Sequence, residues 1–398
     1  MTSLGACWVM TRDRWMELGG LDAHEVMPAG RERELAAEYG YFYGHRYCDG
    51  NANQDTYPDS DENSYPDAHS HKHGYRYLQD YGMGPETPVG QPAPKTMELG
   101  PRDRLSQAFW HEQKKGNTVE TAWGDCVLLD MRHLGEKKIN ERLPLVRELA
   151  ESYLGVDIVK DPVPIRPVVH YMMGGISTNT QAATPLPGLF AAGECACVSL
   201  NGANRLGSNS LVELLVFGKR AALSAIEHIQ TTAVANTAML EACADQTQQR
   251  IRELFSRTDG TESVAGLRKE MMTTMEDNAG IYRTEVSLKA SCDKLAELRD
   301  RYARVHLEDK SNVFNTHMIY TLEVGSMLEA AHAIAHSALQ RKESRGSHQR
   351  LDYTARDDAH FLKHSLAYYN GGADPRIDYL DVVITRSPPG ERIYGGGV

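Results

Sequence analysis

The chain has 398 residues, of which 41% are hydrophobic and 24% are charged, and its formal net charge is −11. This length allows two or three domains with a sizeable core, and the composition is that of a globular protein. The acidic balance excludes nucleic acid as the main partner, because no basic stripe is present to displace counterions. No run of 18 apolar residues occurs, so we expect no transmembrane helix. The seven cysteines are scattered and odd in number, which predicts reduced thiols rather than disulfides.

Residues 45–73 differ in composition from the rest of the chain. They contain almost no aliphatic side chains and are dense in Asp, Asn, Ser, Pro and His, so they cannot bury enough apolar surface to fold alone. We interpret them as a solvated linker. The alternative is a metal site, because His69, His71 and His73 alternate and would share one face of a strand. We predict no metal site in this chain.

Apolar spacing predicts mostly helices after this linker. The expected helices cover residues 104–114, 137–154, 211–229, 235–257, 263–277, 286–305 and 320–342. A buried strand is expected over 123–131. In the segment RIDYLDVVIT near the C-terminus, the strand formers are Ile377, Tyr379, Val382 and Ile384.

The stretch from 166 to 215 combines the features of an anion-binding site. His170 precedes a Gly-Gly pair, and Glu194 ends a short apolar run. Arg205 lies in a loop of small polar residues that offers its stem no apolar support, which favours bidentate capture of a carboxylate or phosphate. The residues Ser208 to Ser210 are candidates to begin a helix, whose free N–H groups would attract an anion. The alternatives are a structural histidine, a surface turn acid, and an arginine that only binds loop carbonyls.

Several motifs in this region together resemble one family. HYMMGG, GLFAAGECA and GANRLGSNSL are similar to the flavoprotein subunit of fumarate reductase and succinate dehydrogenase. So are GYRYLQDYGMGPETP, MELGPRDRLSQAF, LDMRHLGEKKINERLP, SNVFNT, HSALQRKESRGSHQRLDY, RDDAHFLKHSLAY and DVVITRSPPGERIYGG. The similarity covers about 73–398 and is strongest to the bacterial quinol:fumarate reductase type. Each motif alone is weak, but their combination in this order is specific.

The resemblance implies a chemical role for three residues. The family interconverts fumarate and succinate on FAD, with hydride passing between flavin N5 and substrate carbon. Arg102, in G-P-R-D, matches the proton donor. His170 and Arg205 match ligands of the substrate carboxylates.

The resemblance also implies cofactor contacts and partners. Glu194, Ser210 and Leu211 match residues that contact FAD. An iron–sulfur subunit and membrane anchor subunits would complete a quinone-linked complex, peripheral at the cytoplasmic face of the bacterial inner membrane.

The implied fold is an α/β and α+β multidomain one, with a partial FAD-binding domain, a capping domain, a helical domain and a small C-terminal strand region. We expect the boundaries to be as follows: 1–72 an unassigned, partly disordered leader; 73–165 part of the capping domain; 166–225 the returning part of the FAD-binding domain; 226–350 the helical domain; and 351–398 the strand region.

The sequence also departs from the family pattern. We find no G-x-G-x-x-G loop for the FAD pyrophosphate, and Asn201 stands where a histidine is usual. We therefore expect the N-terminal FAD-binding part to be lacking. Two alternatives follow: an L-aspartate oxidase-like flavoenzyme, which shares H-x-x-G-G and R-L-x-x-N-S-L, and a non-catalytic fragment unable to hold FAD.

Overall fold

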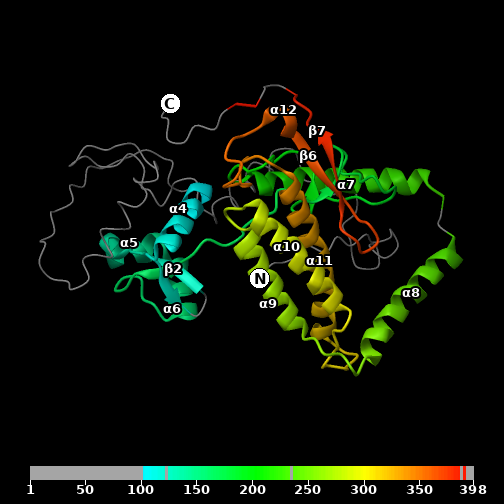
Figure 1. Ribbon diagram of the computed structural model, residues 1–398, viewed down its shortest axis with the longest axis horizontal. Coiled ribbons are helices and arrows are strands. Elements are labelled where there is room, and N and C mark those ends of the chain that lie inside the picture. The colour runs from blue at the N-terminus through cyan, green and yellow to red at the C-terminus, as the bar shows by residue number, and fades with distance from the viewer. Residues whose placement is uncertain (1–101, 122–123, 234–235, 386–388, 391–398) are drawn as a thin grey trace, which may run out of the picture. The chain divides into compact units, whose positions relative to one another are not determined.

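The computed structural model describes residues 102–121, 124–233, 236–385 and 389–390 (Figure 1). The expected leader, 1–72, lies outside these residues, as do His69, His71 and His73, the alternative metal site. The described helices are α4 (Arg102–Lys115), η2 (Arg132–Leu134), α5 (Gly135–Arg142), α6 (Pro144–Leu154), α7 (Asn209–Thr231), α8 (Thr237–Ser256), α9 (Val264–Ala279), α10 (Glu285–Tyr302), α11 (Thr316–Gln340) and α12 (Asp358–Phe361). The described strands are β1 (Val119–Thr121), β2 (Gly124–Leu129), β3 (Val163–Ile165), β4 (Ile176–Ser177), β5 (Ala196–Cys197), β6 (Lys363–Tyr368) and β7 (Arg376–Asp381).

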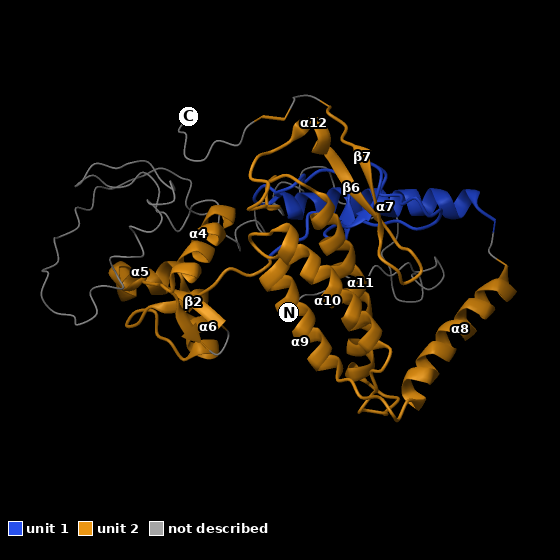
Figure 2. Ribbon diagram, in the orientation of Figure 1, with its two compact units in different colours: residues 1–65, 170–233 blue, residues 66–169, 234–398 orange. Residues whose placement is uncertain are grey.

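The chain divides into two compact units (Figure 2). We call unit 1 the residues Met1–Tyr65 with His170–Ala233, and unit 2 the residues Pro66–Val169 with Val234–Val398. Among the described helices, none combines the length and the apolar character that a membrane crossing needs.

The first described part of unit 2 is a three-stranded antiparallel sheet with helices. The strand order is β1-β2-β3, and the strand expected over 123–131 is confirmed as β2. Its small core consists of Met131, Ile139, Ala150, Ile158 and Val163.

The single helix expected over 137–154 is wrong, because two helices meet at Pro144. Leu143 leaves the helical region with φ −130°, and Pro144 begins α6. A proline in a helix interior lacks an N–H and clashes with the preceding turn, whereas it is well suited to the first helical position. Gly155, in the left-handed conformation, then ends α6.

The centre of unit 2 is a bundle of α9, α10 and α11, in which α10 lies beside α11 (Figure 1). The helices expected over 263–277, 286–305 and 320–342 are confirmed, with ends shifted by a few residues. Their apolar faces meet in one core: Val264, Leu267, Met271, Cys292, Leu295, Leu298, Val305, Val324, Leu328, Ala331 and Ala335. A capping box between Thr284 and Ser287 fixes the start of α10.

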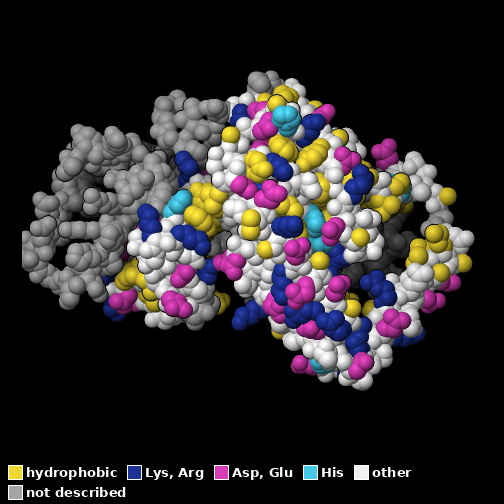
Figure 3. All heavy atoms as spheres, viewed as in Figure 1, with side chains coloured by type: hydrophobic (Ala, Val, Ile, Leu, Met, Phe, Trp, Pro, Cys, Tyr) yellow, Lys and Arg dark blue, Asp and Glu magenta, His cyan; other side chains and the backbone are white. Residues whose placement is uncertain are grey.

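Acidic and basic side chains gather together over this bundle (Figure 3). Arg301 on α10 donates hydrogen bonds to both oxygens of Glu262 and of Glu270. Hydrogen bonds from Arg301 and from Lys294 lower the pKa of Glu270 to about 2. This pairing joins the last turn of α10 to α9 and to the segment before it.

A C-terminal hairpin, β6 with β7, follows the bundle. Its antiparallel register runs from Lys363 opposite Asp381 to Tyr368 opposite Arg376. Ile377 and Tyr379 are in β7 as expected, but Val382 and Ile384 are not. The reason is that the chain before Lys363 forms α12, so β6 does not extend far enough to pair with the residues after Asp381.

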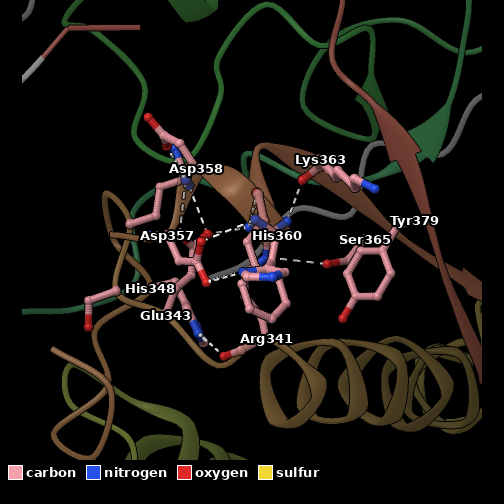
Figure 4. A network of polar contacts seen from close by, with 12 residues as sticks. Arg341, Glu343, His348, Asp357, Asp358, His360, Lys363, Ser365 and Tyr379 are labelled. Atoms are coloured by element: carbon pink, nitrogen blue, oxygen red, sulfur yellow. Dashed lines mark hydrogen bonds and ion pairs between the residues drawn. The ribbon is translucent and has the colours of Figure 1, made fainter. Parts of the chain in front are cut away.

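A buried carboxylate anchors the end of α11 to this hairpin region (Figure 4). Glu343 is fully buried and accepts hydrogen bonds from Arg341, from Arg345 Nε at 2.8 Å and from the backbone N–H of Asp357 at 2.9 Å. Arg341 also donates to the backbone carbonyl of Lys363 at the start of β6. A buried charge is tolerated only when it is paired and hydrogen-bonded, and Glu343 meets both conditions.

The described part of unit 1 contains the parallel pair β4 and β5 followed by α7. The helix expected over 211–229 is confirmed and extends from Asn209 to Thr231. Ser208 is its N-cap by position, but its backbone is left-handed with φ 65° and its side chain makes no capping hydrogen bond.

Candidate functional site

The pairing of β4 with β5 brings two distant loops of unit 1 together. The N–H of Ile176 donates to the carbonyl of Cys195 at 2.9 Å, and Ile176 pairs with Ala196. Gly175, with φ 145°, makes this approach possible, since a Cβ there would lie 2.6 Å from the carbonyl oxygen of Cys195. Because the two strands are parallel, the segment before β4 and the segment before β5 lie at the same end of the pair.

The loop after β5 returns to the segment before β4, and Arg205 in that loop contacts Tyr171. Its guanidinium lies over the ring of Tyr171, 4.4 Å from the ring centroid, and its Nη1 donates to the carbonyl of Leu206 at 2.9 Å. Its Nε is buried and has no hydrogen-bond partner among the described residues. A cation held against an aromatic face and left with unused donors is suited to binding an anion.

A buried acid on α7 holds the tyrosine. The hydroxyl of Tyr171 donates to Glu213 Oε2 at 3.1 Å, and the side-chain amide of Asn201 donates to the same oxygen at 2.6 Å. Glu213 is only 2% exposed. Burial, together with the charge of Glu213, raises the pKa of Tyr171 to about 12, so the phenol keeps its proton and remains a donor.

Sequence reasoning did not identify Glu213. The available signal was an acid at the fifth position of α7, inside the otherwise apolar run LVELL. An acid on a buried helix face requires a partner. Nothing in the linear order, however, indicated that the partners were Tyr171 and Asn201.

Two other predicted residues lie beside this group. Glu194, at the end of the apolar run, accepts a hydrogen bond from the backbone N–H of Met172 at 3.2 Å. His170 is exposed and directly precedes Tyr171. Glu194 and Arg205 therefore both contact residues 171–172, and the role of His170 stays a prediction.

The start of α7 supplies backbone donors near the same loop. Ser210 is half-buried and Leu211 is exposed in the first turn, and the N–H of Leu211 donates to the carbonyl of Ser208 at 3.2 Å. No side chain caps this turn. Its remaining N–H groups and the positive end of the helix dipole favour an electron-rich ligand.

Arg102 belongs to unit 2, where it is the first residue of α4. Its side chain is exposed, and its carbonyl accepts a hydrogen bond from the hydroxyl of Ser106 at 2.9 Å. The role of Arg102 stays a prediction from the resemblance.

Within the described ranges, one group of side chains has ligand atoms close enough for a metal: His332, His336 and Asp374, within 4.8 Å of one another. However, His332 Nδ1 lies 2.8 Å from Arg299 Nη1. Arginine can only donate, so neutral His332 accepts at Nδ1 and carries its proton on Nε2. A metal would need the lone pair of Nε2 and a donating Nδ1–H. The arrangement instead points the Nε2–H of His332 toward Asp374, 3.6 Å away in the β6–β7 turn.

Two family models and several curated proteins are similar to this chain. The model of a fumarate reductase flavoprotein C-terminal domain matches residues 268–394, and that of an FAD-binding domain matches residues 69–211. The fumarate reductase flavoprotein subunit of Serratia sp. is 58% identical over 327 residues, which are 82% of this chain and 54% of that protein. The succinate dehydrogenase flavoprotein subunit of Coxiella burnetii is 40% identical over 310 residues, which are 75% of this chain and 50% of that protein.

A solved structure of a fumarate reductase is also similar to this chain. The chain of a mutant Escherichia coli quinol fumarate reductase is 56% identical, with a TM-score of 0.77, and the match covers 82% of this chain and 56% of that one. The chain spans about half the length of the curated relatives it matches.

The match of residues 69–211 to the FAD-binding domain model places the chain in the class of flavoproteins that bind FAD. Within that class, the chain belongs to the family of fumarate reductase and succinate dehydrogenase flavoprotein subunits. The expected multidomain α/β and α+β fold is confirmed.

Proposed function

We propose that this chain takes part in the flavin-dependent interconversion of fumarate and succinate. The observation that carries the proposal is Arg205, which is stacked on Tyr171 and keeps a buried Nε without a partner among the described residues. Both proposed substrates are dicarboxylates. A guanidinium fixed in this way can hold one carboxylate through two hydrogen bonds, which a lysine cannot do.

The residues of unit 1 fit FAD. The first turn of α7, with Ser210 and Leu211, has no side-chain cap, so its backbone donors can face the electron-rich flavin. Glu194 offers an exposed carboxylate that can accept hydrogen bonds from hydroxyl groups of the cofactor. When bound, FAD supplies the hydride chemistry, which no amino-acid side chain provides.

In this proposal the chain binds, polarises and protonates the substrate. Arg205 and His170 hold the carboxylates, and donors at these positions stabilise the negative charge that develops as the alkene is reduced. Arg102 delivers the proton to the second carbon. Arginine normally keeps its proton, so this role requires that the proton be replaced at once through neighbouring groups.

The partners are proposed from the same family. The solved relatives include quinol–fumarate reductase with menaquinol molecules. We therefore propose an iron–sulfur subunit and membrane anchor subunits as partners, with this chain peripheral at the cytoplasmic face of the bacterial inner membrane.

The test uses a fusion of the E. coli relative's segment that precedes the matched region with residues 73–398 of this chain. We expect bound flavin and oxidation of reduced viologen that depends on fumarate. Arg102→Gln should abolish turnover and leave flavin bound. Arg142→Gln, the same change at an exposed position on α5, should leave turnover unchanged. Retained activity in Arg102→Gln would contradict its role, and turnover of aspartate in preference to fumarate would favour the L-aspartate oxidase alternative.

A further inference from the structure

One arginine attaches the turn between β6 and β7 to the helical bundle. Arg299 on α10 uses each nitrogen of its guanidinium group for a different partner. Nη2 donates to the carbonyl of Gly372 in the turn, and Nη1 contacts His332 Nδ1 on α11 at 2.8 Å. Nε lies 3.1 Å from a carboxylate oxygen of Glu329, which is also on α11. A single side chain therefore joins α10, α11 and the turn.

Two histidines on α11 lie against the same turn. His332 and His336 are four residues apart, so they share one face of the helix, and their ring centroids are 4.5 Å apart. Their Nε2 atoms lie 3.6 Å and 3.7 Å from the same oxygen of Asp374 in the turn. Both nitrogens are buried and have no hydrogen-bond partner among the described residues. The Asp374 carboxylate is 72% exposed, so it compensates a charge on either ring only weakly.

Further titratable groups face the histidine pair from α10. Asp293 favours a charged His336, whereas Arg299 disfavours it. The thiol of Cys292 is neutral, because burial and the nearby carboxylates raise its pKa to about 11. Burial is the largest influence on both histidines: it lowers the pKa of His336, and it lowers that of His332 to about 4. Both rings are therefore neutral while the turn lies on α11.

A proton on His332 is incompatible with this arrangement. In the neutral ring Nδ1 accepts from Arg299, but in the imidazolium ion Nδ1 carries a hydrogen of its own. Two donors and two positive charges would then face each other across 2.8 Å. When the turn lifts from α11, solvent reaches the ring and its pKa returns toward about 6.5. The lifted state therefore binds the proton more tightly, and its population grows as the pH falls.

We propose that His332 and His336 make the β6–β7 turn a pH-sensitive latch, which is closed on α11 while both rings are neutral and opens when His332 takes up a proton. Closure is most favourable above about pH 6.5 and is lost as the pH falls toward about 4. Between these limits the ratio of open to closed turn rises by up to about tenfold for each pH unit. All the groups of the latch belong to unit 2 and none to the arginine site, so the proposal does not depend on the proposed activity.

The test is native-state hydrogen exchange of the full chain between about pH 7.5 and about pH 4.5, with each rate corrected for the intrinsic pH dependence of amide exchange. The equilibrium constant for opening, measured on peptides covering 366–378, should rise by at least about tenfold between about pH 6.5 and about pH 4.5. His332→Gln combined with His336→Gln keeps an acceptor for Arg299 and a donor toward the turn but cannot take up a proton. In this double variant the rise should shrink to less than about twofold.

His133→Gln is the matched control, because it makes the same change at an exposed position in η2 and should leave the rise unchanged. Asp374→Asn tests the other titratable group of the turn. If protonation of Asp374 opened the turn, this variant would abolish the rise, whereas we expect the rise to persist. The proposal is overturned if the unchanged chain shows no rise, if the double glutamine variant behaves like His133→Gln, or if Asp374→Asn abolishes the rise.

A measurement on the unchanged chain covers the case in which the buried glutamines prevent folding. Titration of the His332 ring by NMR should show proton uptake over the same pH range in which the turn opens. Uptake of the proton while the turn stays closed would overturn the proposal. None of these measurements requires flavin or turnover, so failure of the proposed function would leave their outcome readable.

Discussion

The buried carboxylate of Glu343 leads to a quantitative prediction about stability. Glu343→Gln keeps the shape of the side chain but removes its charge. One of its two oxygens becomes an NH₂ group. In the place of Oε1 this group faces donors on Arg341 and Arg345, and in the place of Oε2 it faces donors on Arg345 and the backbone of Asp357. Two partly buried guanidinium groups lose a carboxylate that is fully buried between them.

The expected cost follows from these contacts. Removing one partner of a buried ion pair destabilises a protein by about 3–5 kcal/mol, because the remaining charge is buried without compensation. Arg345 keeps a second carboxylate, Asp358, at 2.6 Å, so we expect the lower part of this range, about 3 kcal/mol. The loss should be local to the end of α11 and to the β6–β7 hairpin, since Arg341 joins them.

Native-state hydrogen exchange measures this loss where it occurs. Peptides covering 336–368 should show an opening free energy lower by about 3 kcal/mol in Glu343→Gln. The matched control is Asp381→Asn, because the Asp381 carboxylate is 86% exposed and lies 3.6 Å from Lys363, and this control should change stability by less than about 0.5 kcal/mol. If Glu343→Gln behaved like Asp381→Asn, the buried carboxylate would not anchor the hairpin, and the argument would fail.

Two further predictions concern the helical bundle. Burial lowers the pKa of His332 and of His348 to about 4, so the folded state holds both side chains neutral. The unfolded state takes up these protons at a higher pH, so the free energy of unfolding is highest above about pH 6.5 and falls as the pH drops toward 4. The loss is up to about 3 kcal/mol for each group. Urea titrations at pH 7.5, 5.5 and 4 should show the unfolding midpoint of the bundle falling, and a constant midpoint would refute this linkage. Leu295→Ala, in the middle of the bundle core and 0% exposed, should cost about 2–5 kcal/mol by the same titration at pH 7.5. Val286→Ala, at an exposed position on the same helix, should cost less than about 0.5 kcal/mol, and equal effects would contradict the assignment of the core.

The helices were predictable where one local signal dominated. α9 and α10 carry regular apolar spacing and polar starts, so the sequence indicated both within a few residues. The break at Pro144 was missed because the apolar period continues across it, although proline chemistry alone forbids one continuous helix there. The end of β7 was missed for a different reason: Val382 and Ile384 favour a strand, but a strand also needs a partner backbone, and propensity does not report one.

The candidate site was also predictable from the sequence only in part. Arg205 was identifiable because its loop offers no apolar support for a long cationic side chain. The support it does have, the ring of Tyr171 held by Glu213 from α7, depends on contacts between residues 42 positions apart. Such contacts form only in the folded chain, and neither β4 nor β5, with two residues each, has a sequence signature of its own.

The β4–β5 pair also determines where unit 1 can tolerate insertions and substitutions. The connection between the two strands covers 178–195 and turns at residues 184–189, where the N–H of Thr184 donates to the carbonyl of Leu189. Lengthening a loop costs little, since the closure entropy grows only with the logarithm of its length. Insertions near the exposed Leu186 should therefore leave the arginine site in place. At Gly175, by contrast, the addition of a single methyl group would force the two strands apart. Sequence variation in this unit is thus expected at the tip of the loop and not at its base.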